Sequence, residues 1–353
     1  MINQLRYGRS LKKKKIAEKN TGNVYSLLLL KDGRLATTSS HKDIKVYNLK
    51  TYNIDNILKG HTDIVTSVCQ LENNYLVSSS YDCTLCIWRQ NKTYFVVDEI
   101  FTAHTDKIHK VIALSNQRIA SCSEDKTIKI WKGQKPYEII QTLRQFNQPV
   151  ESIIQIKGKE ELLSGSYYGK SLKIWSLISF ECITDIDQMY SFDRNSIFES
   201  PSRILLIGCD NKIAILKSTN YKLIKIIQDE DFGFISSICE LDEDNYLIGC
   251  EDGKLYVINV KTLKHTLVKR RAHEEDIICM INIGNNTIIS GSYDKSIKIW
   301  SIIKEEEKPK KEKISIWDNI KNIKFIKDLR NKDRENKSEQ EINKEKEPDK
   351  DPK

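Results

Sequence analysis

Residues 104–131, HTDKIHKVIALSNQRIASCSEDKTIKIW, decide the fold of this chain. Apolar and polar residues alternate over 108–114 and again over 118–123, a pattern typical of short, half-buried β-strands. A polar turn at 124–126 leads to a third expected strand over 127–131. A fourth strand is expected after each such unit, as residues 93–100 follow Trp88. Short strands joined by tight turns predict an antiparallel meander.

The same unit recurs along the 353 residues at a nearly fixed interval of 41 to 44 residues. The seven units end at Tyr47, Trp88, Trp131, Trp175, Leu216, Ile258 and Trp300. A period in this range is the signature of a radially repeated all-β architecture. We therefore predict an all-β, seven-bladed β-propeller of four-stranded antiparallel blades over residues 20–303.

Three units share four residue types at identical spacing, with 21 positions from His to Asp and six from Asp to Trp. These sets are His61, Ser78, Asp82, Trp88; His104, Ser121, Asp125, Trp131; and His273, Ser290, Asp294, Trp300. On these residues the chain resembles the WD-repeat (Trp-Asp) β-propeller family over roughly residues 9–303. The resemblance implies a hydrogen-bonded structural group inside each blade, and it implies a platform that commonly holds peptides of partner proteins.

A serine, a histidine and an aspartate also suggest a hydrolase triad. A catalytic triad occurs once and opens on a cleft, whereas this set recurs from blade to blade and ends on an indole. The sequence therefore favours a structural role, in which the polar chain satisfies buried donors and acceptors. We expect a protein that is not an enzyme.

The other four units keep only part of the pattern. Asp210 and Asp252 retain the turn acid six residues before Leu216 and Ile258, but the aromatic residue is absent. In the first unit His41 stands in the aspartate position, and in the fourth Tyr168-Gly169 replaces it with one extra residue.

Charge is unevenly distributed along a chain of net charge +8. Residues 1–19 contribute +6 and residues 304–353 contribute +2, so the propeller body carries no net charge. This neutrality weakens the nucleic-acid interpretation of a basic protein. No apolar run is long enough to span a bilayer, and the first residues show no signal-peptide pattern. Nine scattered cysteines suggest reduced thiols, and hence a cytoplasmic or nuclear location.

The two charged ends are expected to have different roles. Counting offsets from the second unit places a closing outer strand over residues 9–16 of the basic segment 1–19, which includes Lys12–Lys15. These lysines suit an outer strand protected from unwanted pairing, or a patch for nucleic acid, acidic membrane or nuclear import. The tail, 304–353, is expected to be disordered except for a short amphipathic helix over 314–330. That helix could dock on the propeller, a partner or a membrane surface, and residues 313–317 offer a competing closing strand.

The candidate partner-binding residues lie beside the turn acids, at one end of every blade. One set immediately precedes the turn acid or its equivalent: Ser40, Tyr81, Glu124, Tyr167, Cys209, Glu251 and Tyr293. The other lies three residues after the histidine or its equivalent: Ile64, Lys107, Phe192, Phe234 and Asp276. From these we select as partner-binding residues Tyr81, Glu124, Tyr167, Glu251, Tyr293, Lys107, Phe234 and Asp276. The alternative is that they are ordinary solvated turn residues.

No motif calls for a metal or a cofactor. Cys83 and Cys86 form one Cys-x-x-Cys pair, but no second pair has matching spacing, so packing is the favoured interpretation. The sequence thus predicts a non-enzymatic interaction scaffold that binds partner proteins. The alternative is an RNA- or chromatin-associated subunit that uses Lys12–Lys15 and the basic tail.

Overall fold

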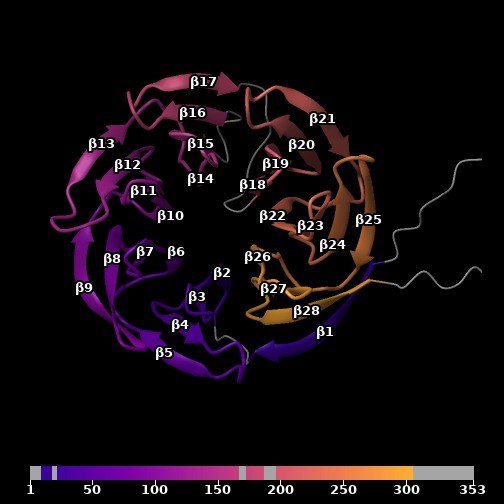
Figure 1. Ribbon diagram of the computed structural model, residues 1–353, viewed down its shortest axis with the longest axis horizontal. Helices are drawn as coiled ribbons and strands as arrows, with labels where there is room; N and C mark the ends of the chain where they lie inside the picture. The colour runs from indigo at the N-terminus through magenta and orange to yellow at the C-terminus, as the bar shows by residue number, and fades with distance from the viewer. Residues whose placement is uncertain (1–8, 18–21, 167–171, 187–195, 305–353) are drawn as a thin grey trace, which may run out of the picture. The chain divides into compact units, whose positions relative to one another are not determined.

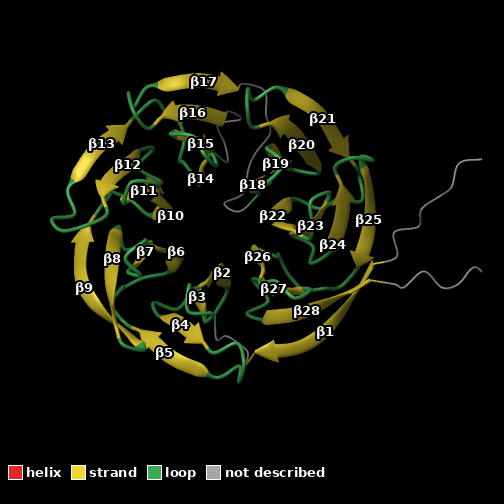
Figure 2. Cartoon of the chain, viewed as in Figure 1, coloured by secondary structure: helices red, strands yellow, loops and turns green. Residues whose placement is uncertain are grey.

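The computed structural model describes residues 9–17, 22–166, 172–186 and 196–304. Within these residues every regular element is a β-strand (Figure 2), and no helix that could cross a bilayer is present. The chain divides into two units, Met1–Ile303 and Lys304–Lys353. In the first, 28 strands form seven four-stranded antiparallel sheets arranged as the blades of a ring (Figure 1), which confirms the predicted seven-bladed propeller.

The first four blades follow the chain without crossovers. Blade 1 contains β2 (Val24–Leu29), β3 (Leu35–Ser39), β4 (Ile44–Tyr47) and β5 (Ile54–Leu58). Blade 2 contains β6 (Val65–Gln70), β7 (Leu76–Ser80), β8 (Thr84–Asn91) and β9 (Tyr94–Thr102). Blade 3 contains β10 (Ile108–Leu114), β11 (Arg118–Ser123), β12 (Ile128–Lys132) and β13 (Ile139–Leu143). Blade 4 contains β14 (Ser152–Gln155), β15 (Glu161–Gly165), β16 (Leu172–Ser176) and β17 (Cys182–Ile186).

The last three blades include the one that closes the ring. Blade 5 contains β18 (Ile197–Glu199), β19 (Ile204–Cys209), β20 (Lys212–Lys217) and β21 (Leu223–Gln228). Blade 6 contains β22 (Ile235–Glu240), β23 (Asn245–Cys250), β24 (Leu255–Asn259) and β25 (Lys264–Lys269). Blade 7 contains β26 (Cys279–Asn282), β27 (Thr287–Gly291), β28 (Ile297–Lys304) and, as its outermost strand, β1 (Arg9–Ala17).

The ring closes because β1, from the start of the chain, pairs with β28 near residue 300 (Figure 1). Residues 9–16 are those for which the sequence predicts a closing strand. The strand covers an edge of β28 that would otherwise expose unpaired backbone groups. The competing strand over 313–317, the predicted helix over 314–330 and the rest of the tail lie outside the described residues.

The core consists of apolar clusters between neighbouring blades. Each of the seven boundaries, which we call seams, is filled by one cluster that draws buried residues from both blades. The residue that ends each sequence unit packs against the preceding blade: Trp131 joins Val77 and Ile87 of blade 2, for example. The tryptophans therefore hold neighbouring blades together, and their side chains are nearly inaccessible.

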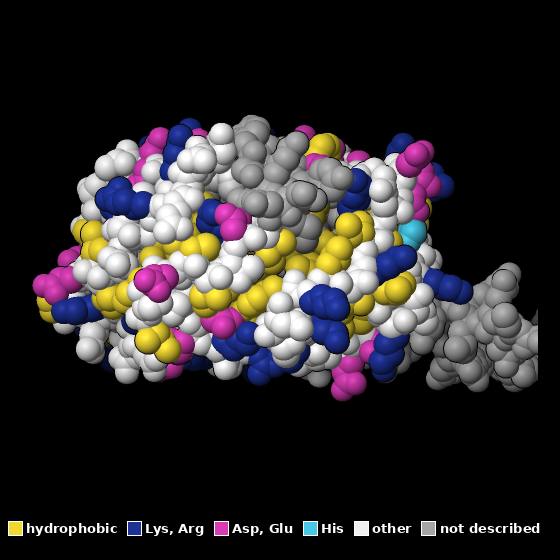
Figure 3. Space-filling view, turned by 90° about the horizontal axis from the view of Figure 1, so that it is seen from above, with side chains coloured by type: hydrophobic (Ala, Val, Ile, Leu, Met, Phe, Trp, Pro, Cys, Tyr) yellow, Lys and Arg dark blue, Asp and Glu magenta, His cyan; other side chains and the backbone are white. Residues whose placement is uncertain are grey.

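The outer circumference carries exposed apolar side chains. Most large apolar residues that are exposed lie on outer strands, including Val97 on β9, Ile139 on β13, Ile183 on β17 and Ile224 on β21. Figure 3, which views the ring from the side where β17 lies, shows apolar side chains as a band along this surface. Outer strands are the edges of their sheets, so no further strand pairs with their outer edge.

Candidate functional site

The three repeated residue sets form continuous hydrogen-bonded chains. In blade 3, His104 Nδ1 lies 2.8 Å from Asp125 Oδ2, and His104 Nε2 lies 2.7 Å from Ser121 Oγ. The indole Nε1–H of Trp131 donates to the same Ser121 Oγ at 2.9 Å. Blades 2 and 7 repeat these contacts with distances of 2.6–3.0 Å, through His61, Ser78, Asp82, Trp88 and through His273, Ser290, Asp294, Trp300.

The chemistry of these groups fixes the direction of each bond. Burial lowers the pKa of His104, so the ring is neutral at pH 7. The Asp125 carboxylate can only accept, so it receives the Nδ1–H, and Nε2 accepts the hydroxyl proton of Ser121. Ser121 is fully buried between the indole and the imidazole. Its hydroxyl is therefore committed to the network and closed to a substrate.

A fifth side chain belongs to each network and was not anticipated from the sequence. The hydroxyl of Thr127, two residues after Asp125, donates to Asp125 Oδ1 at 2.6 Å. Thr84 and Ser296 make the same contact in blades 2 and 7. Burial opposes ionisation of Asp125, but hydrogen bonds from His104 and Thr127 outweigh it and hold its pKa well below the ordinary value. A hydroxyl residue two positions after the turn acid was the signal in the sequence.

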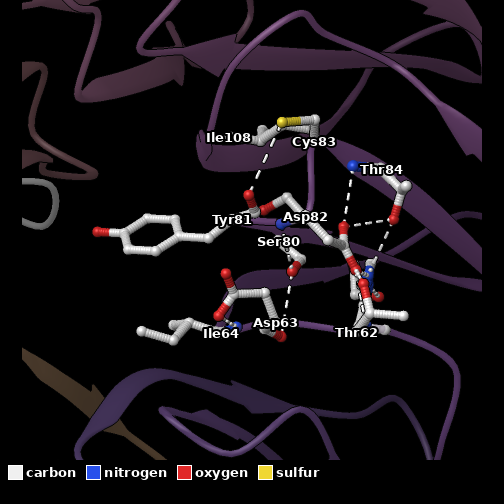
Figure 4. Close-up of polar contacts among 12 residues, drawn as sticks. Thr62, Asp63, Ile64, Ser80, Tyr81, Asp82, Cys83, Thr84 and Ile108 are labelled. Atoms are coloured by element: carbon white, nitrogen blue, oxygen red, sulfur yellow. Dashed lines mark hydrogen bonds and ion pairs between the residues drawn. The ribbon is translucent and has the colours of Figure 1, made fainter.

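Residues immediately before the turn acids lie outside the hydrogen-bonded networks. In blade 2 the side chain of Tyr81 points away from the hydrogen-bonded group formed by Asp82, Thr84 and Thr62 (Figure 4). Adjacent residues thus serve different purposes, since Asp82 is bound into the blade while Tyr81 is directed out of its network. The side chain of Tyr81 remains half-buried.

The same backbone hydrogen bond joins the two sets of candidate residues in four blades. The N–H of the residue before the turn acid donates to the carbonyl of the residue three after the histidine position, at 2.9–3.0 Å. The pairs are Tyr81 with Ile64, Glu124 with Lys107, Glu251 with Phe234, and Tyr293 with Asp276. These eight residues define what we call the rim. Tyr167 and Phe192 lie outside the described residues.

The rim side chains gather most densely where blades 2, 3 and 4 meet. The Lys107 Nζ lies 5.2 Å from the centroid of the Tyr81 ring, within cation–π range. The His109 and Tyr81 rings pack edge to face at a centroid distance of 6.1 Å. His109 Nε2 lies 2.6 Å from Glu124 Oε2, and its Nδ1 lies 3.5 Å from Glu151 Oε2. We call Tyr81, Lys107, His109, Glu124 and Glu151 the His109 cluster.

Backbone geometry explains how residues of two blades reach one point. The ladder between β10 and β11 has an irregularity between Ile108 and Lys110, so His109 is the extra residue of a β-bulge. Across the seam, the N–H of Val150 donates to the carbonyl of Ser123. This bond places Glu151, the next residue of blade 4, beside Glu124, the next residue of blade 3.

The sequence predicted part of this cluster. It selected Tyr81, Lys107 and Glu124, but not His109 or Glu151. The missing pair follows from a bulge and from contact across a seam, and neither has a marker in the sequence. Around the ring, Tyr293 packs edge to face on Tyr25 at 5.6 Å, so it is half-buried rather than fully displayed.

The remaining described rim residues differ in their exposure. Phe234 is 45% exposed, and burial raises the pKa of Glu251. Asp276 is half-buried. The pair Cys83 and Cys86 forms no disulfide; the nine cysteines are free, and Cys86 is fully buried.

Comparison with known proteins gives a family assignment for the repeats. The model of the WD domain, G-beta repeat, matches residues 53–89, 97–132 and 261–301, which contain the three complete His–Ser–Asp–Trp sets. The chain is 39% identical over 62 residues, 18% of its length, to an uncharacterised WD repeat-containing protein of Schizosaccharomyces pombe. It is 27% identical over 164 residues, 45% of its length, to ribosome biogenesis protein YTM1 of Vanderwaltozyma polyspora.

These similarities are partial, since the matched segments span 16% and 29% of the two relatives. Three repeats match the family model, however, and all seven blades of the ring have the four-stranded arrangement. The chain is therefore a seven-bladed β-propeller that contains three WD repeats.

Proposed function

We propose that this protein is a non-enzymatic scaffold whose partner protein binds on the rim, centred on the His109 cluster. The observation that carries the proposal is the concentration of aromatic, cationic and anionic side chains at the junction of blades 2, 3 and 4. The conspicuous Ser–His–Asp sets are buried within the blades and cannot meet a partner directly.

The rim has the properties of a preformed binding surface. Backbone hydrogen bonds hold its residues in pairs, and ring contacts restrain Tyr81, so little side-chain freedom is lost when a partner docks. Aromatic anchors of this kind contribute disproportionately to interface affinity. A peptide or domain with an apolar residue beside a charged one fits the cluster. Nine free cysteines support a reducing compartment, and we propose a cytoplasmic location.

The test is affinity purification of the full chain with Tyr81, Tyr167 and Tyr293 all changed to alanine. We expect specific co-purifying proteins to be lost, while circular dichroism and the melting profile retain a cooperative fold. Tyr94→Ala is the matched control, because this tyrosine is 57% exposed on the outer strand β9, away from the rim. An unchanged set of bound proteins in the triple variant would refute binding at the rim.

A second candidate is a subunit of an RNA-containing assembly. Two observations favour it: one relative is named a ribosome biogenesis protein, and Lys12–Lys15 lie on β1, the outermost strand of blade 7. Phosphate binding weakens steeply with salt because counterions are released, whereas an aromatic peptide site depends on salt only weakly. If the protein binds RNA through Lys12–Lys15, the amount of bound RNA should fall as the salt concentration rises. It should also fall when Lys12–Lys15 are changed to glutamine. Salt-independent binding would exclude it. In this case a nuclear location becomes the alternative proposal.

A further inference from the structure

We propose that the His109 cluster holds a divalent transition-metal ion of the zinc class at the seam between blades 3 and 4. His109 and Glu151 are the direct ligands, and Glu124 orients the imidazole. The proposal adds a ligand to the rim assigned above as the partner site. It is tested by metal binding alone, so it can fail while partner binding survives.

The spacing of the donor atoms suits one ion. One donor atom from each of His109, Glu124 and Glu151 lies within 4.8 Å of the others. Zinc bonds to nitrogen and oxygen are about 2.0–2.2 Å long, so two ligands at a tetrahedral angle are separated by about 3.3 Å. His109 Nδ1 and Glu151 Oε2 are 3.5 Å apart. An ion between them requires only a small adjustment.

The contact between the imidazole Nε2 of His109 and Glu124 resembles the contacts that orient metal-binding histidines. Metal-binding histidines usually donate their second ring N–H to a carboxylate, which fixes the tautomer and the ring orientation. Here Nε2 lies 2.6 Å from Glu124 Oε2, and the Tyr81 and His109 rings pack edge to face. The His109 side chain is only 3% exposed, so the imidazole is held in place.

Charge and donor type select the class of ion. With a neutral imidazole, the two carboxylates carry two negative charges against the single positive charge of Lys107, and a divalent cation between the carboxylates would neutralise both. One nitrogen and carboxylate oxygens suit a borderline ion such as zinc better than magnesium or calcium, which prefer all-oxygen sites.

Other blades use the bulge differently, which supplies an internal comparison. The bulges of β6 and β22 place Thr66 and Ser236 at the position of His109. Their hydroxyls donate to backbone carbonyls of the next blade at 2.8 and 2.9 Å. Glu251 is the counterpart of Glu124 in blade 6, but no histidine accompanies it. The ligand set is therefore particular to the third and fourth blades among the described residues.

A bound metal is not the only explanation of the contacts. An imidazolium that donates a proton to each carboxylate would also satisfy the two distances, without a metal. The two states differ in one measurable property, which is saturable metal binding near neutral pH.

The experiment is isothermal titration of the chelator-treated full chain with zinc chloride, followed by cobalt chloride spectroscopy. We expect one ion per chain, and a cobalt spectrum without the charge-transfer band that thiolate ligands produce. His109→Gln and Glu151→Gln should abolish saturable binding, and Glu124→Gln should weaken it about 10–100-fold. Glu138→Gln is the control, because this exposed glutamate pairs with Lys132 outside the rim and the His109 cluster, and the variant should bind zinc as the unmodified chain does.

Two results would overturn the proposal. One is the lack of saturable zinc binding by the unmodified, folded chain. The other is equal binding by His109→Gln, which would assign the zinc to adventitious ligands. Circular dichroism of each variant separates loss of the ligand from loss of the fold.

Discussion

Blades 3 and 6 have the same strand order but stabilise it in different ways. In blade 3 a polar chain runs from Asp125 through His104 and Ser121 to Trp131. In blade 6 the positions of the serine and the tryptophan hold Ile248 and Ile258, both fully buried. The turn acid of blade 6, Asp252, is one-third exposed and pairs with Lys254 at 2.6 Å.

The difference shows that the network behaves as one unit. When one member of a buried hydrogen-bonded set is removed, its partners lose bonds that water cannot replace. When the buried serine and tryptophan are replaced together by apolar residues, as in blade 6, neither is left without its partner, and the cost is small. Blade 5 agrees with this account, since Leu206 and Leu216 stand at the same two positions and are also buried.

The largest expected effect comes from removing the turn acid in each type of blade. Asp125→Ala should lower the free energy of unfolding by about 3–5 kcal/mol, because it strips a buried network of its acceptor. Asp252→Ala should cost about 1 kcal/mol or less, as expected for a partly exposed ion pair. Urea denaturation of both variants measures the difference. Equal losses would show that the network adds nothing to the blade.

A smaller effect separates complete from partial networks. Ser290 Oγ bonds the side chains of both His273 and Trp300. Ser164 Oγ accepts from the Trp175 indole and donates to the backbone carbonyl of Lys173, in a blade without the histidine. We expect Ser290→Ala to cost about 2–3 kcal/mol and Ser164→Ala about 1–2 kcal/mol, since only Ser290→Ala leaves a buried imidazole without its partner. Thermal unfolding can rank the two. A greater loss for Ser164→Ala would contradict the account.

The smallest expected effect on the free energy of unfolding comes from lowering the pH. This change adds a proton to His104 but removes no side-chain atoms. Burial lowers the pKa of His104 in the folded chain, while the unfolded chain keeps an ordinary histidine near 6.5. As pH falls below that value, the unfolded state binds a proton that the folded state resists, so stability declines. Denaturation at pH 7.0 and 5.5 should show this decline, and His104→Gln should reduce it. An identical pH dependence in the variant would refute the assignment.

Much of the fold could be predicted because each strand is set by the residue pattern of a short, continuous segment. Alternation alone placed strands at residues 108–114 and 118–123, the bounds that the structure gives for β10 and β11. Such strands form wherever a period of two meets a tight polar turn. The repeat also put Glu124 and Lys107 on the same surface, where a backbone hydrogen bond joins them.

The rest of the candidate site could not be predicted in this way. His109 lies within an alternating strand and resembles any other strand residue until the bulge turns it toward Glu124. Glu151 belongs to a blade whose pattern is degenerate, and only contact across the seam reveals its neighbours. Alternation describes single strands, whereas this cluster depends on how two sheets meet.

The pairing of β1 with β28 sets the order in which the ring can be completed. The two strands lie about 290 residues apart in the chain, and a ribosome adds about 5–20 residues per second. About 15–60 s therefore pass between the synthesis of residues 9–17 and the synthesis of their partner strand, β28. During that time their lysine run discourages pairing with other chains. We therefore expect the lysine run to keep this strand unpaired during synthesis, and closure of the ring to be a late step of folding.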